Sequence, residues 1–477
     1  MKNIKNYAKN NIFIYNSLTN KKEKFIPIEY NKIGMYVCGP TIYNNIHLGN
    51  LRTFIFFDIL YRYLKHLNFK VKYIRNITDI THLEFKFNLG NKPMEIIQKY
   101  LLNFYFILNK FNILSPNIEP RSTGHIIEQI INIKNILKKK FAYINKGSIY
   151  FDINYYNKIF GNYGNILNNI DINKEVNLNN KFLEEKKNYY DFAIWKKSNS
   201  GMNWESPWGK GNPGWHIGCS TMSNKYLGNY FDIHGGGIDL KFPHHECEIT
   251  QSNIINNNHY NLAKYWIHTN LLTINNKKMS KSLNNFIIPN DIINGKLKIT
   301  NYKKINPIIV RLYFLQTHYR KIINISNKSL INTEKNYKIL FNILNNIKKI
   351  KPNLKTSSEI NINNIYKIFY LSINEDFNIP LLIYNLFKIN KIIEKCINKK
   401  LNINLKDIKL LYSLIKIFLI DILGLKFKKK NKSINYNKII NKIYDIRNEM
   451  RKNKLYYYSD KLRNILNNYL NIKDNKI

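Results

Sequence analysis

Apolar positions in the first part of the chain alternate between short continuous runs and one long helical repeat. Residues 35–37 and 71–74 are the short runs; Cys38-Gly39-Pro40 breaks the first, and polar residues from Arg75 onward follow the second. Between them, residues 51–67 place apolar side chains on one helix face: Phe54, Phe57, Ile59, Leu60, Tyr63 and Leu64. Strand, helix and strand in this order predict the first half of a doubly wound α/β domain.

Later segments carry a different pattern. Residues 125–139 predict a helix, and residues 143 and 148–151 predict a hairpin, so we expect an insertion between two halves of the sheet. From residue 301 onward the apolar repeat is helical and predicts an α-helical bundle, with segments at 308–315, 340–350, 365–371, 380–397 and 410–423.

Composition adds limits to this picture. The chain has 477 residues, of which 44% are hydrophobic, so it has the material for about three domains. The formal charge of +44 is compatible with RNA, but lysine and asparagine are frequent everywhere, so the charge alone does not identify a ligand. The chain has neither a membrane-length apolar run nor an apolar leader, and its four cysteines are scattered. We expect a cytoplasmic protein with no membrane partner.

Two segments have the chemistry of a phosphate site. His47, Gly49 and Asn50 fall at the start of the expected helix, where backbone N–H groups and the helix dipole favour an anion. Taken alone, a histidine there is more often a cap or a surface residue. The second segment, KKMSKS at residues 277–282, places lysines in an expected loop, where they could follow charge on a triphosphate.

A metal site is a further candidate. His244 and Glu248 are four residues apart on an expected helix and would project from one face, as two ligands must. With Cys38 and Cys219 they form a donor set suited to Zn²⁺. On spacing alone Cys247 could replace Glu248, and isolated cysteines are usually buried apolar residues. The residues by themselves leave these alternatives open.

The segments around these candidates carry a resemblance. HLGN at residues 47–50 and KMSKS at 278–282 resemble the HIGH and KMSKS signatures of class I aminoacyl-tRNA synthetases. MYVCGPT, NITDI, PGWHIGCS and HGGGIDLKFPHHE resemble segments of the cysteinyl-tRNA synthetase family. This resemblance implies an α/β, Rossmann-like class I catalytic domain with a connective insertion, followed by an α-helical bundle. The implied limits are 1–120 and 203–300 for the catalytic halves, 121–202 for the insertion, 301–425 for a tRNA-side bundle and 426–477 for a shortened anticodon-binding tail.

The resemblance also assigns roles to residues. It implies a catalytic set of His47, Asn50, Lys278 and Lys281, and a zinc site of Cys38, Cys219, His244 and Glu248, with Trp215 against the substrate side chain. The implied ATP and adenylate contacts are Gly39, Thr41, His47, Gly49, Asn50, Thr53, Asn76, Thr78, Gly237, Asp239 and Lys281. Four positions depart from the family: Asn50 replaces a more usual His, Asn284 replaces a Gly, and Thr81-His82 replaces two acids.

The implied activity is an ATP-dependent ligation in two steps. L-cysteine and Mg²⁺-bound ATP would give cysteinyl-adenylate, and the 3′-terminal ribose of tRNA(Cys) would then accept the cysteine. One Zn²⁺ per chain would select the thiol, and we expect a monomer. Two rivals are a cysteine ligase with an amino-sugar acceptor, which needs no long region after residue 283, and a non-catalytic RNA-binding paralogue, which would lack pyrophosphate exchange.

Overall fold

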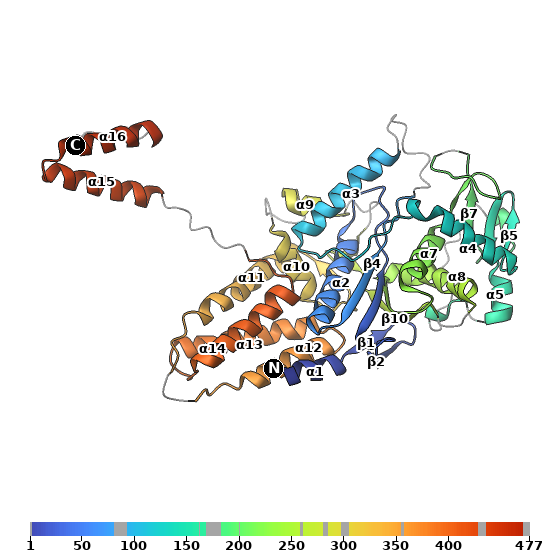
Figure 1. Ribbon diagram of the computed structural model, residues 1–477, viewed down its shortest axis with the longest axis horizontal. Helices are drawn as coiled ribbons and strands as arrows, with labels where there is room; N and C mark the ends of the chain where they lie inside the picture. The colour runs from blue at the N-terminus through green and yellow to red at the C-terminus, as the bar shows by residue number, and fades with distance from the viewer. Residues whose placement is uncertain are drawn as a thin grey trace. The chain divides into compact units, whose positions relative to one another are not determined.

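The protein divides into two compact units, Met1–Leu425 and Lys426–Ile477. A computed structural model describes residues 2–80, 93–161, 163–167, 183–199, 201–257, 261–279, 285–296, 305–353, 357–427 and 436–470 (Figure 1). The first unit contains the sheet, the insertion and the helical bundle. The second contains α15 (Tyr436–Lys452) and α16 (Tyr456–Leu470).

A four-stranded parallel sheet is the centre of the first unit. Its order is β10-β9-β3-β4, and its strands are β3 (Lys32–Val37), β4 (Lys70–Arg75), β9 (Phe231–Gly237) and β10 (Ala263–Thr269). Tyr36 pairs with Ile74 on one side and with His234 on the other. Because the strands are parallel, their carboxyl ends share one edge, where doubly wound sheets bind their ligands. The predicted fold class is confirmed.

Two helices cover opposite faces of this sheet. α2 (Leu48–His66) contacts β4, β9 and β10, and α7 (Trp215–Leu227) contacts β3 and β4 (Figure 1). Successive side chains along each strand point to opposite faces of the sheet, so α2 and α7 contact different residues of the strands. Tyr36 and Ile74 belong to the core that includes Cys219 of α7, whereas the Arg75 guanidinium lies 5.2 Å from the ring centroid of Phe54 in α2.

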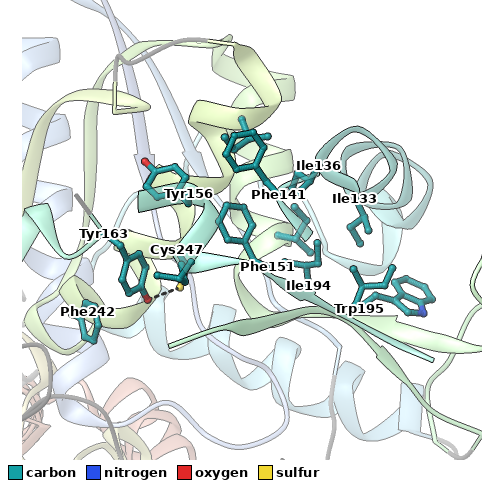
Figure 2. Packing of buried hydrophobic residues seen from close by; sticks show 14 of the residues in the cluster. Ile133, Ile136, Phe141, Phe151, Tyr156, Tyr163, Ile194, Trp195, Phe242 and Cys247 are labelled. Carbon is teal, nitrogen blue, oxygen red and sulfur yellow. Dashed lines mark hydrogen bonds between the residues drawn. The ribbon is translucent and has the colours of Figure 1, made fainter. Parts of the chain in front are cut away.

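The segment between the sheet halves forms an antiparallel sheet of its own, in the order β5-β6-β7-β8. Its strands are β5 (Ala142–Asn145), β6 (Ser148–Phe151), β7 (Phe192–Lys197) and β8 (Gly211–Pro213). α4 (Ile126–Lys138) and α8 (Glu246–Asn256) contribute to the same apolar core, in which Phe151, Ile194 and Trp195 are buried (Figure 2). This antiparallel sheet is therefore packed against α8, which follows β9 of the parallel sheet.

The helical region follows a small sheet. β11 (Leu272–Ile274) pairs antiparallel with β12 (Lys277–Lys278) and parallel with β13 (Ile323–Ile325). The bundle itself consists of α10 (Pro307–Leu315), α11 (Asn327–Ile347), α12 (Ile362–Asn374), α13 (Ile379–Ile397), α14 (Leu405–Lys416) and a final turn, Ile417–Ile422. These helices overlap all the segments that the apolar repeat predicted, although α11 ends at Ile347, before the predicted end at residue 350, and the final turn ends at Ile422.

The remaining elements of the first unit are peripheral. They are α1 (Lys2–Asn10), β1 (Phe13–Asn16), β2 (Lys21–Lys24), α3 (Pro93–Lys110), α5 (Ile153–Phe160), α9 (Pro289–Asn294) and 3₁₀ turns at Thr123–His125, Asn165–Leu167, Leu183–Glu185 and Ile238–Leu240. Within the described ranges, no helix combines the length and the apolar character that crossing a membrane requires.

A buried ion pair fastens the bundle to the catalytic domain. Asp58 of α2, which is 1% exposed, accepts hydrogen bonds from Arg62 Nε at 2.8 Å, from Arg311 of α10 and from the Leu114 backbone N–H at 2.9 Å. Arg311 is fully buried and also donates to the carbonyl oxygens of Leu423 and Phe111. One carboxylate therefore neutralises a guanidinium that has no access to water.

We expect Asp58→Ala to lower the free energy of unfolding by about 3–5 kcal/mol, because it leaves the Arg311 charge buried and uncompensated. The measurement is urea-induced unfolding of both proteins. Glu334→Ala is the matched control, since it removes a surface pair with Lys338 (2.9 Å) and costs less than about 1 kcal/mol. Equal losses for the two variants would contradict the role of the buried pair.

Candidate active site

The predicted phosphate site lies at the first turn of α2. His47 is the N-cap, and its Nδ1 accepts hydrogen bonds from the backbone N–H groups of Gly49 (3.1 Å) and Asn50 (3.3 Å). Asn50 Oδ1 in turn accepts from the His47 backbone N–H at 3.2 Å, which completes a capping box. A Cβ at position 49 would lie 2.9 Å from the His47 ring, so a glycine is required there. In this conformation the helix start is capped by its own residues.

The ends of β3 and β4 hold several of the other predicted contacts. The Gly39 N–H donates to Asn76 Oδ1 at 2.9 Å, and Thr41 and Thr78 form a parallel bridge in which the Ile42 N–H donates to the Thr78 carbonyl. A Cβ at Gly39 would lie 1.6 Å from the Asn76 carbonyl oxygen. The structure therefore brings these residues together at the carboxyl edge of the sheet.

A cavity of about 320 Å³ opens beside this bridge. Its walls include Thr41, Thr78, Ser122, Lys196 and Trp215. This volume lies within the range of small-molecule sites. Trp215 is half exposed, stacks against the His216 ring with 5.6 Å between centroids, and lies 5.0 Å from the His244 ring. The cavity thus adjoins the candidate metal ligands through Trp215.

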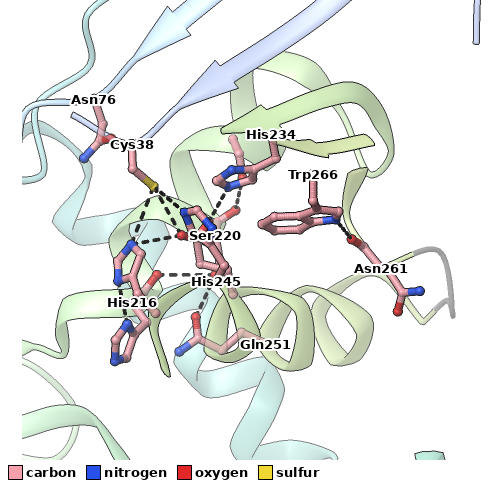
Figure 3. Close-up of polar contacts among 12 residues, drawn as sticks. Cys38, Asn76, His216, Ser220, His234, His245, Gln251, Asn261 and Trp266 are labelled. Atoms are coloured by element: carbon pink, nitrogen blue, oxygen red, sulfur yellow. Dashed lines mark hydrogen bonds and ion pairs between the residues drawn. The ribbon is translucent and has the colours of Figure 1, made fainter. Parts of the chain in front are cut away.

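The four predicted metal ligands form one buried cluster. The donor atoms of Cys38, Cys219, His244 and Glu248 all lie within 4.8 Å of one another. Cys38 Sγ is 3.6 Å from His244 Nε2 and 3.5 Å from Glu248 Oε1, and the latter atom is 2.9 Å from His244 Nε2 (Figure 3). Four donors of S, S, N and O type that converge in this way are able to hold a metal ion.

The electrostatics of this cluster fit a cation. Burial raises the pKa of Cys38, and the neighbouring Cys219 and Glu248 raise it further. A hydrogen bond from Cys38 lowers the pKa of Cys219 to about 6 despite burial. Burial alone would raise the pKa of Glu248, yet His234 and His244 lower it to about 2. Cys38 thus keeps its proton because burial and the neighbouring negative charge both disfavour its thiolate, and a divalent ion at this point would remove that penalty.

His244 and Glu248 lie on one continuous helical run, as the spacing predicted. α8 begins at Glu246, and His244 lies in the π-helical turn that precedes it, Lys241–His245. In that turn Phe242 has an extended backbone (φ −142°, ψ 137°), and Pro243 follows it as the first helical residue, where a missing N–H costs no hydrogen bond. His244 and Glu248 converge, because the helical run directs both side chains to the same point.

Further histidines surround the ligands. His216 Nδ1 lies 2.7 Å from His244 Nδ1, and burial holds the pKa of His216 well below its ordinary value, so this neutral ring accepts the His244 N–H. His234 Nε2 lies 2.8 Å from Glu248 Oε2, and His245 Nδ1 lies 2.8 Å from His268 Nε2 (Figure 3). The sequence analysis gave no role to His234 or His268. His234 directly precedes the glycine run that ends β9, and His268 lies near the carboxyl end of β10; these positions are the signal that could have found them.

These histidines create a second possible donor set. Cys38 and Glu248 also cluster with His234 and His245 within the same distance limit, and Cys38 Sγ lies 3.4 Å from His245 Nε2. The two sets share one thiol and one carboxylate. The predicted set adds Cys219 and His244, and the second set adds His234 and His245.

The remaining predicted residues are less central. Thr53 Oγ1 lies 2.7 Å from Thr269 Oγ1 and joins α2 to β10. Gly237 ends β9, and Asp239 is exposed in the turn that follows. Lys278 ends β12, but its side chain lies outside the described residues, as do Lys281, Asn284, Thr81 and His82.

Comparison with known proteins places this geometry in a family. Residues 24–335 match the model of the tRNA synthetases class I (C) catalytic domain. A cysteine–tRNA ligase of Azobacteroides pseudotrichonymphae is 43% identical over 479 aligned residues, which cover 96% of each chain. The chain belongs to the cysteine–tRNA ligase family. The predicted enzyme class is confirmed, and the ligase of Bacteroides thetaiotaomicron (41% identical, 95% of each chain) agrees with it.

Solved structures extend the likeness to the fold of other class I synthetases. The methionyl-tRNA synthetase of Mycobacterium tuberculosis in complex with methionyl-adenylate superposes with a TM-score of 0.57 at 11% identity, covering 82% of this chain and 92% of its own. A ternary LeuRS–tRNA–LeuAMS complex of Agrobacterium radiobacter K84 gives a TM-score of 0.57 at 10% identity, covering 84% and 85%. None of these relatives favours an amino-sugar ligase or a non-catalytic paralogue.

We expect Cys219→Ala to lose most of the bound metal and His245→Ala to retain one ion per chain, because only Cys219 belongs to the predicted ligand set. Elemental analysis of the purified variants measures the metal-to-protein ratio. Cys247→Ala is the control, since this buried thiol contacts Tyr163 (Sγ to OH, 3.6 Å) and is not in either donor set. The reverse result, with metal lost from His245→Ala alone, would assign the ion to the second set.

Proposed function

We propose that this chain joins L-cysteine to tRNA(Cys) in two steps at the carboxyl edge of its parallel sheet. The carboxylate of cysteine attacks the α-phosphate of Mg²⁺-bound ATP and releases pyrophosphate, and the 3′-terminal ribose then takes the cysteinyl group. The observation that carries the proposal is the buried cluster of Cys38, Cys219, His244 and Glu248 beside the cavity at Trp215. Family membership supports the same reaction.

Within this proposal the chain's own residues position and stabilise charge. His47 and Asn50 meet the phosphates at the start of α2, where their side chains already cap the helix and its dipole favours an anion. ATP would exchange places with part of that cap, because the Gly49 and Asn50 N–H groups now donate to His47 Nδ1. Lys278 and Lys281 follow the departing pyrophosphate. Thr41 and Thr78 line the cavity for the amino acid.

Selection of the thiol rests on the donor set. A Zn²⁺ held by the four ligands would lower the pKa of a substrate thiol and bind its sulfur far more strongly than a serine hydroxyl. The two protein thiols make the site soft, which suits zinc and sulfur. His216 holds the His244 ring in the orientation that directs Nε2 at the other donors.

The test is ATP–pyrophosphate exchange by purified protein of known zinc content. We expect exchange with L-cysteine, none above background with L-serine, and loss of exchange in Cys219→Ala. Cys247→Ala is the matched control and keeps the exchange activity. A folded, zinc-loaded protein without exchange would overturn the proposal and favour the RNA-binding paralogue.

A second prediction concerns His47. We expect His47→Ala to lower the rate of cysteine-dependent exchange by about 10²- to 10³-fold, because it removes a donor at the phosphates. Metal content stays unchanged, since His47 is not in either donor set. His47→Asn, which keeps a capping oxygen at the start of α2, separates the cost to helix stability from the cost to catalysis. Full activity in His47→Ala would remove this residue from the catalytic set.

A further inference from the structure

Arg52 of α2 makes an unusual set of contacts. Its side chain is buried, and its guanidinium lies within hydrogen-bond distance of five backbone carbonyl oxygens. Nη1 donates to Asn270 and Leu271, each at 2.7 Å, and Nη2 lies near His318 (3.2 Å), Tyr319 (3.3 Å) and Lys321 (2.5 Å). Burial lowers the Arg52 pKa to about 10, so the group remains charged at neutral pH. None of the ion pairs found among the described residues involves Arg52.

The carbonyl groups belong to two segments that meet at the small sheet. Residues 270 and 271 connect β10 to β11, and residues 318–321 lead into β13. The two segments are also bonded to each other, because the Asn270 N–H donates to the Tyr319 carbonyl at 2.9 Å and the Ile323 N–H donates to the Leu271 carbonyl at 3.2 Å. Arg52 therefore docks the base of the β11–β12 hairpin on α2.

Two residues that follow the KMSKS segment in the sequence also contact the start of α2. The Leu48 N–H, in the first turn of α2, donates to the Ile287 carbonyl at 3.3 Å, and the ring centroids of His47 and Phe286 are 5.5 Å apart. The KMSKS segment at residues 278–282 thus lies in sequence between two attachments to α2. Arg52 supplies the attachment that precedes it.

We propose that Arg52 is a positioning residue for ATP, which sets the lysine-bearing hairpin at a fixed place relative to the phosphate-binding first turn of α2. The proposal rests on the adenylation reaction argued above. An arginine is needed because its planar fork presents the four N–H groups of Nη1 and Nη2 to carbonyls on two segments, whereas a lysine ammonium has three donors on one atom. Without that fork the hairpin keeps its attachment to α2 at Ile287 and loses the attachment at Asn270 and Leu271.

The experiment compares Arg52→Lys with Arg311→Lys in cysteine-dependent exchange. Arg311 is the matched control, because it is equally buried and also donates to backbone carbonyls, but at the junction of α2 with the bundle. We expect Arg52→Lys to lower kcat/KM for ATP by about 10- to 100-fold, the cost of a small misplacement of reacting groups. The KM for cysteine and the metal content stay within twofold. We expect Arg311→Lys to lower Tm without a selective loss of kcat/KM for ATP relative to the KM for cysteine.

Asn270→Ala provides a second, milder variant if Arg52→Lys does not fold. Asn270 Nδ2 donates to the Arg320 carbonyl at 2.7 Å and so holds the same junction from its exposed side. We expect the KM for ATP to rise about 3- to 10-fold, with the KM for cysteine unchanged. Wild-type ATP kinetics in the folded variants, or equal losses for ATP and cysteine, would overturn the role of Arg52 alone. An inactive wild-type protein would overturn the proposed function as well.

Discussion

The parallel register of β3, β9 and β10 is the constraint on which the site depends. Tyr36 pairs with His234, and His234 pairs with Trp266, so the residues that follow these strands meet at one edge. Cys38 comes directly after β3, His234 lies within β9, and His268 lies near the end of β10. A slip of one residue in any strand would turn its side chains to the opposite face and disperse the cluster. The donors on α7 and α8 can meet Cys38 only because the strand register fixes this edge of the sheet.

Burial strengthens the electrostatic interactions within the metal-ligand cluster, and it also makes an unpaired charge there costly. Glu248 is fully buried with two histidines beside it, and both thiols lie in the same volume, so these groups compete for protons. A charge without water is costly unless it is paired. The same rule explains two of the buried arginines, Arg311 of α10 and Arg52 of α2. Arg311 is neutralised by Asp58, whereas Arg52 is surrounded by carbonyl dipoles that also fix the path of the chain.

The periodic parts of the chain were predictable, because periodicity follows directly from burial on one face. The predicted α2 and bundle helices coincide with observed ones, since every turn repeats the same signal. The contacts of Arg52 were not predictable, because its partners are backbone carbonyls and any residue type supplies one. The histidines that surround the metal ligands were not predicted, for a related reason. His234 and His268 are far apart in the sequence, and only the sheet register brings them to the same cluster.

Asn50 shows how a departure from the family's usual residue fits this geometry. In the proposed site a side chain at position 50 has two functions: it accepts the His47 backbone N–H, which completes the helix cap, and it donates to phosphate. The amide of Asn50 separates these functions between its two ends, because Oδ1 already accepts from His47 at 3.2 Å while Nδ2 carries only donors. A neutral histidine divides the functions between its two ring nitrogens in the same way. In the proposed site the replacement would therefore preserve both functions, and a carboxylate there would preserve only the cap.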